Sequence, residues 1–358
     1  MDEIENHRKE IDDIDSEILR LLNRRAEIVI EIGKVKKNEK VEFHSPEREQ
    51  EILQRLEKSN PGPFPSEALR AVYREILSAS LSLEQPLRVA YFGPKATFTH
   101  LAAMQQFGFS AQYIPVGSIK EVFDTVERGH VNYGVVPIEN STEGVVSYTL
   151  DMFVDSDLKI SAEIMTEISH NLLSLAGKKE DIKKIYSHPQ ATAQCRDWID
   201  TNLPGIPILE APSTARAAEI ASQDTSAGAI ASDLAAMLYG LKVLQRKIED
   251  VINNYTRFLV ISNKHPSKTG RDKTSMMFTI KDRVGALYSM LEPFAKNKIN
   301  LTKIESRPSR KKAWEYIFFV DIEGHIDDEN VKKTLEEVRK ECLFLKVLGS
   351  YPSGQVSK

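Results

Sequence analysis

The chain has 358 residues, 41% of them hydrophobic and 28% charged, which is an ordinary globular composition with room for two or three domains. Its formal net charge is −4 and it has no long run of Lys or Arg, which disfavours a nucleic-acid binder. Two cysteines cannot form a disulfide framework, the N-terminal segment lacks the apolar core of a signal peptide, and no apolar stretch reaches the ~18 residues of a membrane span. These features predict a cytoplasmic protein that binds small molecules and other copies of itself, with no nucleic-acid or membrane partner.

The first part of the chain, residues 1–84, is predicted to be an all-helical domain. It is rich in Ile, Leu, Glu, Lys and Arg, and its prolines and glycines divide it into three segments. We expect a long helix to about residue 37, a second over about 46–59 and a third over about 66–83. Ser45 followed by a proline is a typical start for the second helix.

A mostly apolar seam with 4-3 spacing runs along the first helix for about four heptads. Its members are Ile4, His7, Ile11, Ile14, Ile18, Leu21, Arg25, Ile28, Ile32 and Val35. The arginine in this seam has two interpretations. It is either a polar group that fixes helix pairing or a buried guanidinium that needs an anionic ligand. Taken alone, Arg25 favours the first.

Other basic residues favour the anionic ligand. Lys36 lies three turns after Arg25 on nearly the same face, and Arg48 could approach from the second helix. Arg8 lies 17 residues before Arg25, about 25 Å away along a straight helix, so it could share the site only from another chain. A helix of more than 30 residues also needs a partner to bury it. The segment therefore predicts an intertwined dimer that binds a small acid.

This segment resembles the all-helical chorismate mutase family. The resemblance rests on the strings HRKEIDDID, LLNRRAEIVIEIGKVK, SPEREQEIL and ILSASLSLE. The residues that carry it are Arg8, Arg25, Lys36, Arg48, Glu49, Ser80 and Glu84. The resemblance implies an interlocked dimer in which Arg8 is donated across chains.

The chemistry implied by the resemblance is the pericyclic rearrangement of chorismate to prephenate. The site must hold the compact conformer and stabilise the charge that develops on the ether oxygen. The arginines suit the two carboxylates, Lys36 the ether oxygen and Glu49 the hydroxyl, while Ser80 supports one end of the substrate. Glu84 stands where some family members have Gln. Since a carboxyl must be protonated to donate a hydrogen bond, we predict that mutase activity falls as rising pH ionises it.

The middle part, residues 87–263, alternates short apolar strands with helical stretches, an α/β pattern. The expected strands are 88–92, 133–138, 159–168, 185–187, 208–210, 227–231 and 258–261. Five of these strands end in polar turns at which a helix begins. Ligands of α/β proteins bind at such strand ends, but Ser, Thr and Asn are also common there simply because they cap helices. Capping explains any one turn, whereas all five predict a ligand cleft between two lobes. Because dinucleotide, P-loop, nucleophile-elbow and zinc patterns are missing, we predict no cofactor or metal.

Residues 88–262 resemble prephenate dehydratase. The matching strings are YFGPKATFTHLAA, VVPIENSTEG, SHPQATAQC, IASDLAAMLYGL and NNYTRFLVI. The resemblance implies two α/β lobes arranged like a type II periplasmic binding protein, with prephenate between them. Prephenate loses CO₂ and hydroxide as its ring becomes aromatic, so the enzyme needs mainly one proton donor.

The same resemblance assigns roles to individual residues of the dehydratase segment. Thr256 is the proton donor, and the substrate is oriented by Asn140, Ser187 and Gln194, with Glu139 close by. Thr97 and the amides around it hold a carboxylate. The substrate-binding set also includes Phe98, Arg257 and Phe258, although Arg257 is equally explained as structural and Phe258 as packing beneath the site.

The last part, residues 274–352, follows a polar linker at 264–273 and has a βαββαβ ferredoxin-like pattern. The expected strands are 275–280, 299–306, 315–322 and 344–349, and the helices 285–297 and 327–342. Two short strings, GAL at 285–287 and ESRP at 305–308, resemble the ACT regulatory domain. A loop glycine would also explain the first string, and an edge strand that ends at a proline would also explain the second. The two strings comprise Gly285, Ala286, Leu287, Glu305, Ser306, Arg307 and Pro308. The resemblance implies L-phenylalanine as an allosteric inhibitor bound between paired domains.

Together these segments predict a fused enzyme of phenylalanine biosynthesis that forms a homodimer or tetramer. Two alternatives stay open. The helical segment could serve dimerisation alone beside a single dehydratase activity. The chain could also be a non-catalytic binding protein that senses amino acids.

Overall fold

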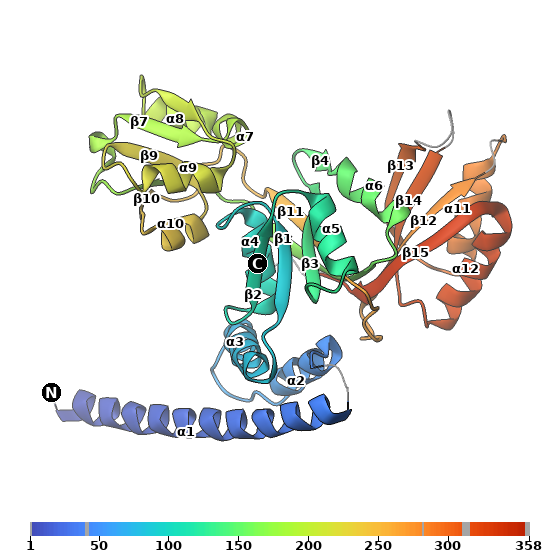
Figure 1. Ribbon diagram of the computed structural model, residues 1–358, viewed down its shortest axis with the longest axis horizontal. Coiled ribbons are helices and arrows are strands. Elements are labelled where there is room, and N and C mark those ends of the chain that lie inside the picture. The colour runs from blue at the N-terminus through green and yellow to red at the C-terminus, as the bar shows by residue number, and fades with distance from the viewer. Residues whose placement is uncertain (1, 40–42, 281–282, 310–315, 355–358) are drawn as a thin grey trace. The chain divides into compact units, whose positions relative to one another are not determined.

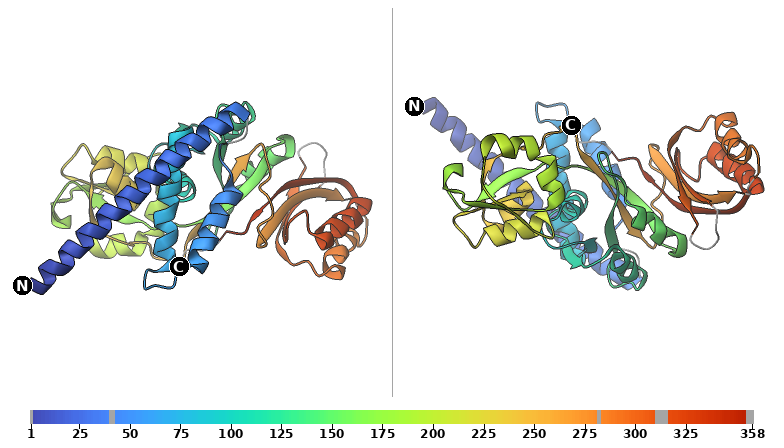
Figure 2. Two further views of the ribbon diagram at one scale, coloured as in Figure 1. Left: turned by 90° about the horizontal axis from the view of Figure 1, so that it is seen from below. Right: turned by 90° about the horizontal axis from the view of Figure 1, so that it is seen from above.

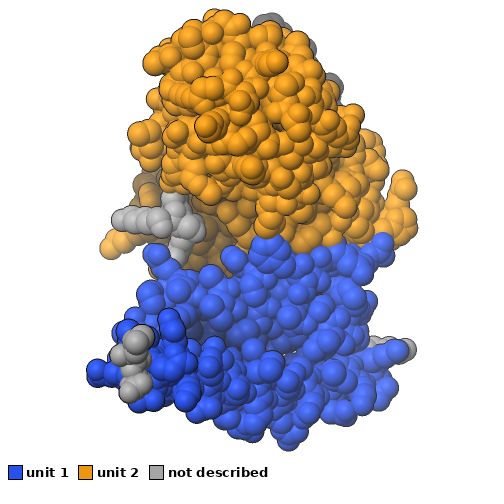
Figure 3. Space-filling model, turned by 90° about the vertical axis from the view of Figure 1, so that its left-hand side faces the viewer, with its two compact units in different colours: residues 1–88, 107–112 blue, residues 89–106, 113–358 orange. Residues whose placement is uncertain are grey.

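The computed structural model describes residues 2–39, 43–280, 283–309 and 316–354 (Figure 1). The chain divides into two compact units, coloured separately in Figure 3. Unit 1 comprises residues 1–88 and 107–112, and unit 2 comprises residues 89–106 and 113–358. Unit 1 holds the N-terminal helices, and unit 2 holds the sheets. Among the described residues, every helix is too short or too polar to span a bilayer.

The three predicted helices of unit 1 are confirmed as α1 (Asp2–Glu39), α2 (Pro46–Lys58) and α3 (Ser66–Glu84). The cap of α2 forms as expected, because Ser45 Oγ accepts a hydrogen bond from the backbone N–H of Arg48 at 3.3 Å and Pro46 opens the helix. Figure 2 shows α1 continuing well past α3 at its N-terminal end.

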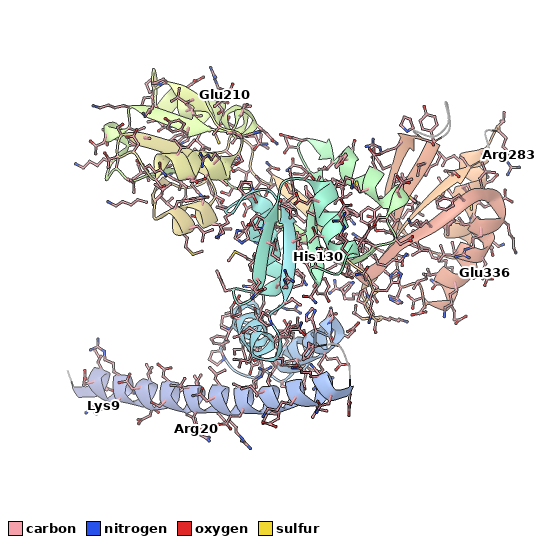
Figure 4. All side chains as sticks on the ribbon, in the orientation of Figure 1. Lys9, Arg20, His130, Glu210, Arg283 and Glu336 are labelled. Carbon is pink, nitrogen blue, oxygen red and sulfur yellow. The ribbon has the colours of Figure 1, made fainter. Side chains whose placement is uncertain are left out.

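The seam of α1 is exposed in this single copy. Its eight Ile, Leu and Val side chains are 44–63% exposed. Figure 4 shows side chains standing out along α1, with Lys9 and Arg20 labelled. In the described part of the three helices, the buried residues are Val29, Gly33, Leu77 and Ser78. Unit 1 therefore has a small core of its own and leaves a long apolar surface without a partner.

Helix α3 comes close to α1 at a glycine. A Cβ atom on Gly33 would lie 3.2 Å from Cγ and 3.4 Å from Cα of Glu84. Glycine lacks that atom, so α3 can pack against α1 at this level. Although glycine costs helix stability, here it brings the end of α3 onto the face of α1 that carries Lys36.

The first lobe of unit 2 is built on a sheet with the strand order β2-β1-β3-β11-β5, and β4 pairs with β3. The strands are β1 (Arg88–Phe92), β2 (Gln112–Val116), β3 (Tyr133–Asn140), β4 (Gly144–Val145), β5 (Lys159–Glu167) and β11 (Tyr255–Ser262). Its helices are α4 (Phe98–Phe107), α5 (Ile119–Glu127) and α6 (Ser147–Asp155). Buried Phe123 and Phe153 meet edge to face beneath this sheet.

The second lobe has the strand order β10-β6-β9-β7-β8. Its strands are β6 (Asn171–Ser174), β7 (Lys184–Ser187), β8 (Ile208–Glu210), β9 (Ala227–Ala231) and β10 (Lys242–Gln245). Its helices are α7 (Pro189–Gln194), α8 (Arg196–Asn202), α9 (Thr214–Ala221) and α10 (Asp233–Tyr239), with a 3₁₀ turn at Lys179–Asp181. His188, Ser213 and Ser232 cap α7, α9 and α10, which confirms the capping interpretation of three predicted turns. Strands β2, β4, β6 and β10 were not predicted.

The C-terminal part of unit 2 confirms the predicted βαββαβ order. It consists of β12 (Asp272–Ile280), α11 (Ala286–Lys296), β13 (Leu301–Pro308), β14 (Tyr316–Glu323), α12 (Glu329–Glu341) and β15 (Cys342–Pro352). The antiparallel sheet has the order β13-β14-β12-β15. Residue 315, the first residue of one predicted strand, lies outside the described residues.

The two faces of this C-terminal sheet pack against different parts of unit 2. Phe278 and Val320 face α11 and α12, whereas Phe319 and Tyr351 join the core of the first lobe. A Cβ atom on Gly349 would lie 2.3 Å from the carbonyl oxygen of Ile160. The absence of that atom lets β15 cross β5 at backbone contact distance and docks the sheet onto the first lobe.

Candidate active sites

In unit 1 the structure pairs two of the predicted basic residues on α1 with predicted residues on α3. Lys36 Nζ lies 3.0 Å from Glu84 Oε2, and Arg25 Nη1 donates to Ser80 Oγ. Lys36 Nζ also donates to the carbonyl of Phe43 at 2.8 Å. The Glu84 side chain is 8% exposed, so a partly exposed cation meets a largely buried carboxyl group. Four of the predicted mutase residues thus share the face between α1 and α3.

The other three predicted mutase residues are held by neighbours. Arg48 donates to Glu51 at 2.8 Å, and the Glu49 carboxylate lies 3.3 Å from His44 Nε2. Arg8 lies in the first turns of α1, 71% exposed, where it contacts Glu5. This position agrees with the expectation that Arg8 cannot reach the Arg25 site of its own chain.

In the first lobe of unit 2, β3 and β11 bring Asn140 and Thr256 opposite each other in register. The carboxamide of Asn140 has a fixed orientation, because its Oδ1 accepts hydrogen bonds from the backbone N–H groups of Thr142 (2.9 Å) and Glu143 (3.0 Å). Its Nδ2 must therefore donate, and it does so to Thr256 Oγ1 and to Asn254 Oδ1, each at 2.8 Å. Since the Thr256 oxygen accepts, its own proton stays available for a ligand.

A chain of amide side chains continues from this pair into the second lobe. Asn254 Nδ2 donates to Gln194 Oε1 at 3.4 Å, and Gln194 Nε2 donates to Glu143 Oε1 at 3.3 Å. His170 Nε2 lies 2.9 Å from the same Gln194 oxygen. Burial lowers the pKa of His170, so its ring is neutral at pH 7, and Nε2 carries the proton because Gln194 Oε1 can only accept.

Three members of this chain, Glu143, His170 and Asn254, were missed as site residues. Glu143 and Asn254 stand within the strings VVPIENSTEG and NNYTRFLVI, so the signal was present but was given to their neighbours. His170 follows β5 without a motif around it, and sequence alone offers no signal for it.

Thr97 and Phe98 lie where β1 passes into α4. The edge of the Phe98 ring faces the ring of His170, with the centroids 5.7 Å apart. Thr97 Oγ1 donates to the carbonyl of Pro94 at 3.0 Å. Of the amides around Thr97 that were expected to hold a carboxylate, the Ala96 N–H donates to His100 Nδ1 at 3.2 Å in this structure. Burial, and then the Lys95 charge, lowers the pKa of His100 to about 4, so this nitrogen can accept at pH 7.

Ser187 and Phe258 are both buried. Ser187 ends β7, and its hydroxyl donates to the carbonyl of His188 at 3.2 Å. The described residues therefore do not connect Ser187 to the chain of Asn140 and Gln194. Phe258, 2% exposed on β11, fits the packing interpretation.

Two predicted residues, Glu139 and Arg257, face away from Asn140 and Thr256. Each is adjacent to one of that pair on β3 or β11, and successive side chains of a strand point to opposite faces. Glu139 meets Lys303, and Arg257 meets Glu163, both on the face toward the C-terminal sheet. In this structure neither Glu139, expected beside the reacting groups, nor Arg257, expected among the substrate-binding residues, shares the face of Asn140 and Thr256.

The predicted effector residues lie at two places in the C-terminal module. Gly285 precedes α11 with a φ of +78°, a left-handed conformation that suits glycine, and Ala286 and Leu287 follow it. On β13, exposure alternates, with Ser306 and Pro308 exposed and Glu305 and Arg307 half-buried. Arg307 reaches Asp151 of the first lobe at 3.2 Å. Ser306 and Arg307 are adjacent on β13, so their side chains point to opposite faces of the strand.

The described residues contain no cluster of three or more His, Cys, Asp or Glu side chains that could hold a metal ion. The polar groups of both sites are instead amide, hydroxyl, ammonium, guanidinium and carboxyl groups. Such groups bind and orient an anionic organic molecule by hydrogen bonds and charge.

Known proteins match nearly the whole chain. Residues 7–85 match chorismate mutase type II, residues 89–266 match prephenate dehydratase and residues 274–340 match the ACT domain. The chain is 54% identical over 356 residues to the bifunctional chorismate mutase/prephenate dehydratase of Aquifex aeolicus, and the match covers 98% of each chain.

Solved structures match the part of the chain that follows the helices. The prephenate dehydratase of Arthrobacter aurescens in complex with L-Phe is 35% identical, with a TM-score of 0.68, over 74% of this chain and 90% of that one. A structure described as GqqA, a quorum quenching acylase, is 28% identical with a TM-score of 0.69 over 74% of this chain and 97% of that one. Two activities thus occur on one architecture, so the fold alone does not decide between them. The match to the Aquifex enzyme extends through the helical segment as well, and the chain belongs to the bifunctional chorismate mutase/prephenate dehydratase family, with an ACT domain after its two enzymatic domains.

Proposed function

We propose that unit 1 rearranges chorismate to prephenate with the residues on the α1–α3 face, and that Asn140 and Thr256 of unit 2 convert prephenate to phenylpyruvate. The observation that carries the proposal is the fixed orientation of the Asn140 amide, which leaves the Thr256 proton free to be donated. The predicted domain limits, 1–84, 87–263 and 274–352, are part of this proposal, as is a place in the cytoplasm.

The mutase reaction needs positioning and charge, not a nucleophile. Arg25, with Arg48 and a partner's arginine, binds the two carboxylates of chorismate and holds the compact conformer. Lys36 stabilises the negative charge that develops on the ether oxygen as the C–O bond breaks. Glu84 lies beside Lys36, at 3.0 Å, and in its protonated form would donate to the same oxygen.

A Glu84→Gln substitution is expected to keep or raise mutase kcat. The carboxamide has nearly the same shape and always offers an N–H group to the ether oxygen, whereas the carboxyl group in this structure accepts from Lys36 at 3.0 Å. The measurement is mutase kcat of both proteins under the same conditions. A loss of more than about tenfold in Glu84→Gln would show that a hydrogen-bond donor at this position does not serve the reaction.

The dehydratase reaction is driven by aromatisation of the ring. The bond to the ring carboxylate breaks and its electron pair enters the ring as CO₂ departs, while the hydroxyl leaves from the opposite carbon and takes up a proton as water. Thr256 Oγ1 donates to that departing oxygen. Asn140, Asn254 and Gln194 form one hydrogen-bonded row that holds the substrate beside Thr256.

The exposed seam of α1 supports an intertwined homodimer, or a tetramer built from such dimers. Full burial of an Ile, Leu or Val side chain contributes about 1.5–3 kcal/mol, and because the seam residues are 44–63% exposed, a partner would add about half of that for each. The small core of unit 1 makes a second copy the natural cover for these side chains. In that dimer Arg8 would approach the partner's Arg25.

The ACT domain supports feedback control by L-phenylalanine. The end product would bind one state of the oligomer better than the other and so lower dehydratase activity. The prephenate dehydratase of Arthrobacter aurescens, which matches 74% of this chain, was solved in complex with L-Phe.

A single time course tests all three assignments. Purified protein is mixed with chorismate and a chelator, and chorismate, prephenate and phenylpyruvate are followed with and without L-phenylalanine. We expect phenylpyruvate to form in the presence of the chelator and to be suppressed by L-phenylalanine. Prephenate accumulating alone would contradict the Thr256 assignment, and unchanged chorismate would contradict the mutase assignment.

A further inference from the structure

A balanced set of charges joins the ACT sheet to the first lobe of unit 2. The lobe contributes Arg257, Glu163 and Glu139, and the sheet contributes Lys273, Asp321 and Lys303. Glu163 is the most deeply buried, with a side chain 2% exposed, and it accepts from Lys273 Nζ at 2.7 and 2.9 Å. Buried charges persist only where they are paired, so these contacts fix the two faces against each other.

Arg257 lies at the centre of this set, and its guanidinium contacts both faces. Nε donates to Glu163 Oε2 at 2.7 Å on the lobe side. On the sheet side, Nη1 meets Asp321 Oδ2 at 2.7 Å and Nη2 donates to Tyr351 Oη at 3.1 Å. Burial opposes the charged form, but Tyr351, Asp321 and Glu163 outweigh it and raise the pKa of Arg257. The guanidinium is therefore a fixed cation held from two domains.

The position of Arg257 in β11 gives this contact a consequence for the dehydratase site. Arg257 directly follows Thr256, and the pairing of β11 with β3 shifts register between Arg257 and Phe258. The pairing of β11 with β5 is regular at this point, so the irregularity lies on the β3 side, the side of Asn140, where the ladder holds the strand less tightly. A side-chain anchor at Arg257 therefore helps to set the direction in which the Thr256 hydroxyl points.

We propose that Arg257 is a positioning residue for the dehydratase reaction, and that Asp321 and Tyr351 of the ACT sheet hold it in place so that Thr256 meets the leaving hydroxyl. This inference rests on the proposed role of Thr256 and goes beyond it. It gives the ACT domain a part in catalysis even without an effector. It also provides a route from the sheet to the site, because a movement of Asp321 or Tyr351 would move Arg257 and, one residue away, Thr256.

The test compares Asp321→Asn with a matched control at the same interface. Lys346 of β15 also docks the ACT sheet, by donating to the carbonyls of Phe153 (3.1 Å) and Ser156 (2.7 Å), but neither of these bonds involves β11. We expect Asp321→Asn to lower dehydratase kcat by about 10- to 100-fold with KM nearly unchanged. Lys346→Met should stay within about twofold of the parent.

The mutase activity of the same chain monitors the concentration of folded unit 1 and should not change in either variant, while thermal unfolding followed by circular dichroism monitors the folding of unit 2. Tyr351→Phe provides a milder second variant if Asp321→Asn does not fold, and it should lower kcat in the same direction. Parental kcat in both Asp321→Asn and Tyr351→Phe would overturn the proposal, as would an equal loss in Lys346→Met. A parent protein without dehydratase activity would instead overturn the proposed function of Thr256.

Discussion

Arg8→Ala and Arg25→Ala variants, each deficient in mutase activity, are expected to restore each other's activity when they share a dimer. Each substitution removes a guanidinium from the carboxylate site and should lower mutase kcat/KM by about 10²–10³-fold in homodimers. In a mixed dimer one site carries both defects and the other carries neither. Random mixing makes about half of the dimers mixed, so about a quarter of the parental activity should return.

The expectation follows from the geometry of α1. Arg8 and Arg25 lie far apart on one straight helix, and Arg8 in this copy contacts only its neighbour Glu5 among the residues described. A site that contains both must therefore take them from different chains. The exposed seam of α1 supplies the surface along which a partner would bring its Arg8 into place.

The matched control mixes two variants whose substituted residues, unlike Arg8 and Arg25, are supplied to each site by the same chain. Arg25 and Lys36 lie on the same helix and both face α3, so Arg25→Ala mixed with Lys36→Met leaves at least one defect in every site. That mixture should stay inactive. Differently tagged variants would be co-expressed, and both the mixture and the isolated mixed dimer would be assayed with chorismate, the isolated mixed dimer with an expected activity of about half the parental value. No recovery in the Arg8 and Arg25 mixture would contradict donation across chains, and dehydratase activity should be normal throughout.

The elements that sequence predicts best have either a hydrophobic periodicity over several turns or a place in a recognisable order of strands and helices. The helices of unit 1 have several turns of periodicity and proline breaks, and they end within about two residues of the expected positions. In the βαββαβ module, each of the six expected elements overlaps the corresponding element of the structure. The strands that were missed are short or carry a contrary signal. Strand β2 contains Pro115 and lies at a sheet edge, where proline is tolerated, and β6 and β10 have four residues each.

The candidate site shows a different limit. A motif resemblance treats neighbouring residues as a group, whereas a strand directs Asn140 and Glu139, or Thr256 and Arg257, to opposite faces. The sequence contains that alternation, but which face meets the ACT sheet depends on a contact between segments far apart in the chain. His170 joins Gln194 only through tertiary structure, and its own surroundings in the sequence do not indicate a site.

Replacing Thr256 with valine is expected to lower dehydratase kcat by about 10²–10⁴-fold, the usual contribution of a positioned proton donor. Valine keeps the shape and the strand propensity of threonine but has no hydroxyl proton. Thr256→Ser keeps the donor and should retain most of the rate. Mutase activity, measured on the same preparations, should be unchanged because it depends on unit 1.

The neighbouring strand offers a matched control for this substitution. Thr166 of β5 pairs with Thr256 in register, is also buried, and donates from its Oγ1 to Gln105 at 2.9 Å. Thr166→Val therefore removes an equivalent buried hydroxyl from the same sheet and should cost about 0.5–1.5 kcal/mol of stability with little change in kcat. If Thr256→Val and Thr166→Val lowered kcat equally, the loss would come from the sheet and not from a proton donor. If a folded Thr256→Val enzyme kept the parental rate, another group must protonate the leaving hydroxyl, and the neutral His170 ring beside Gln194 would be the next one to replace.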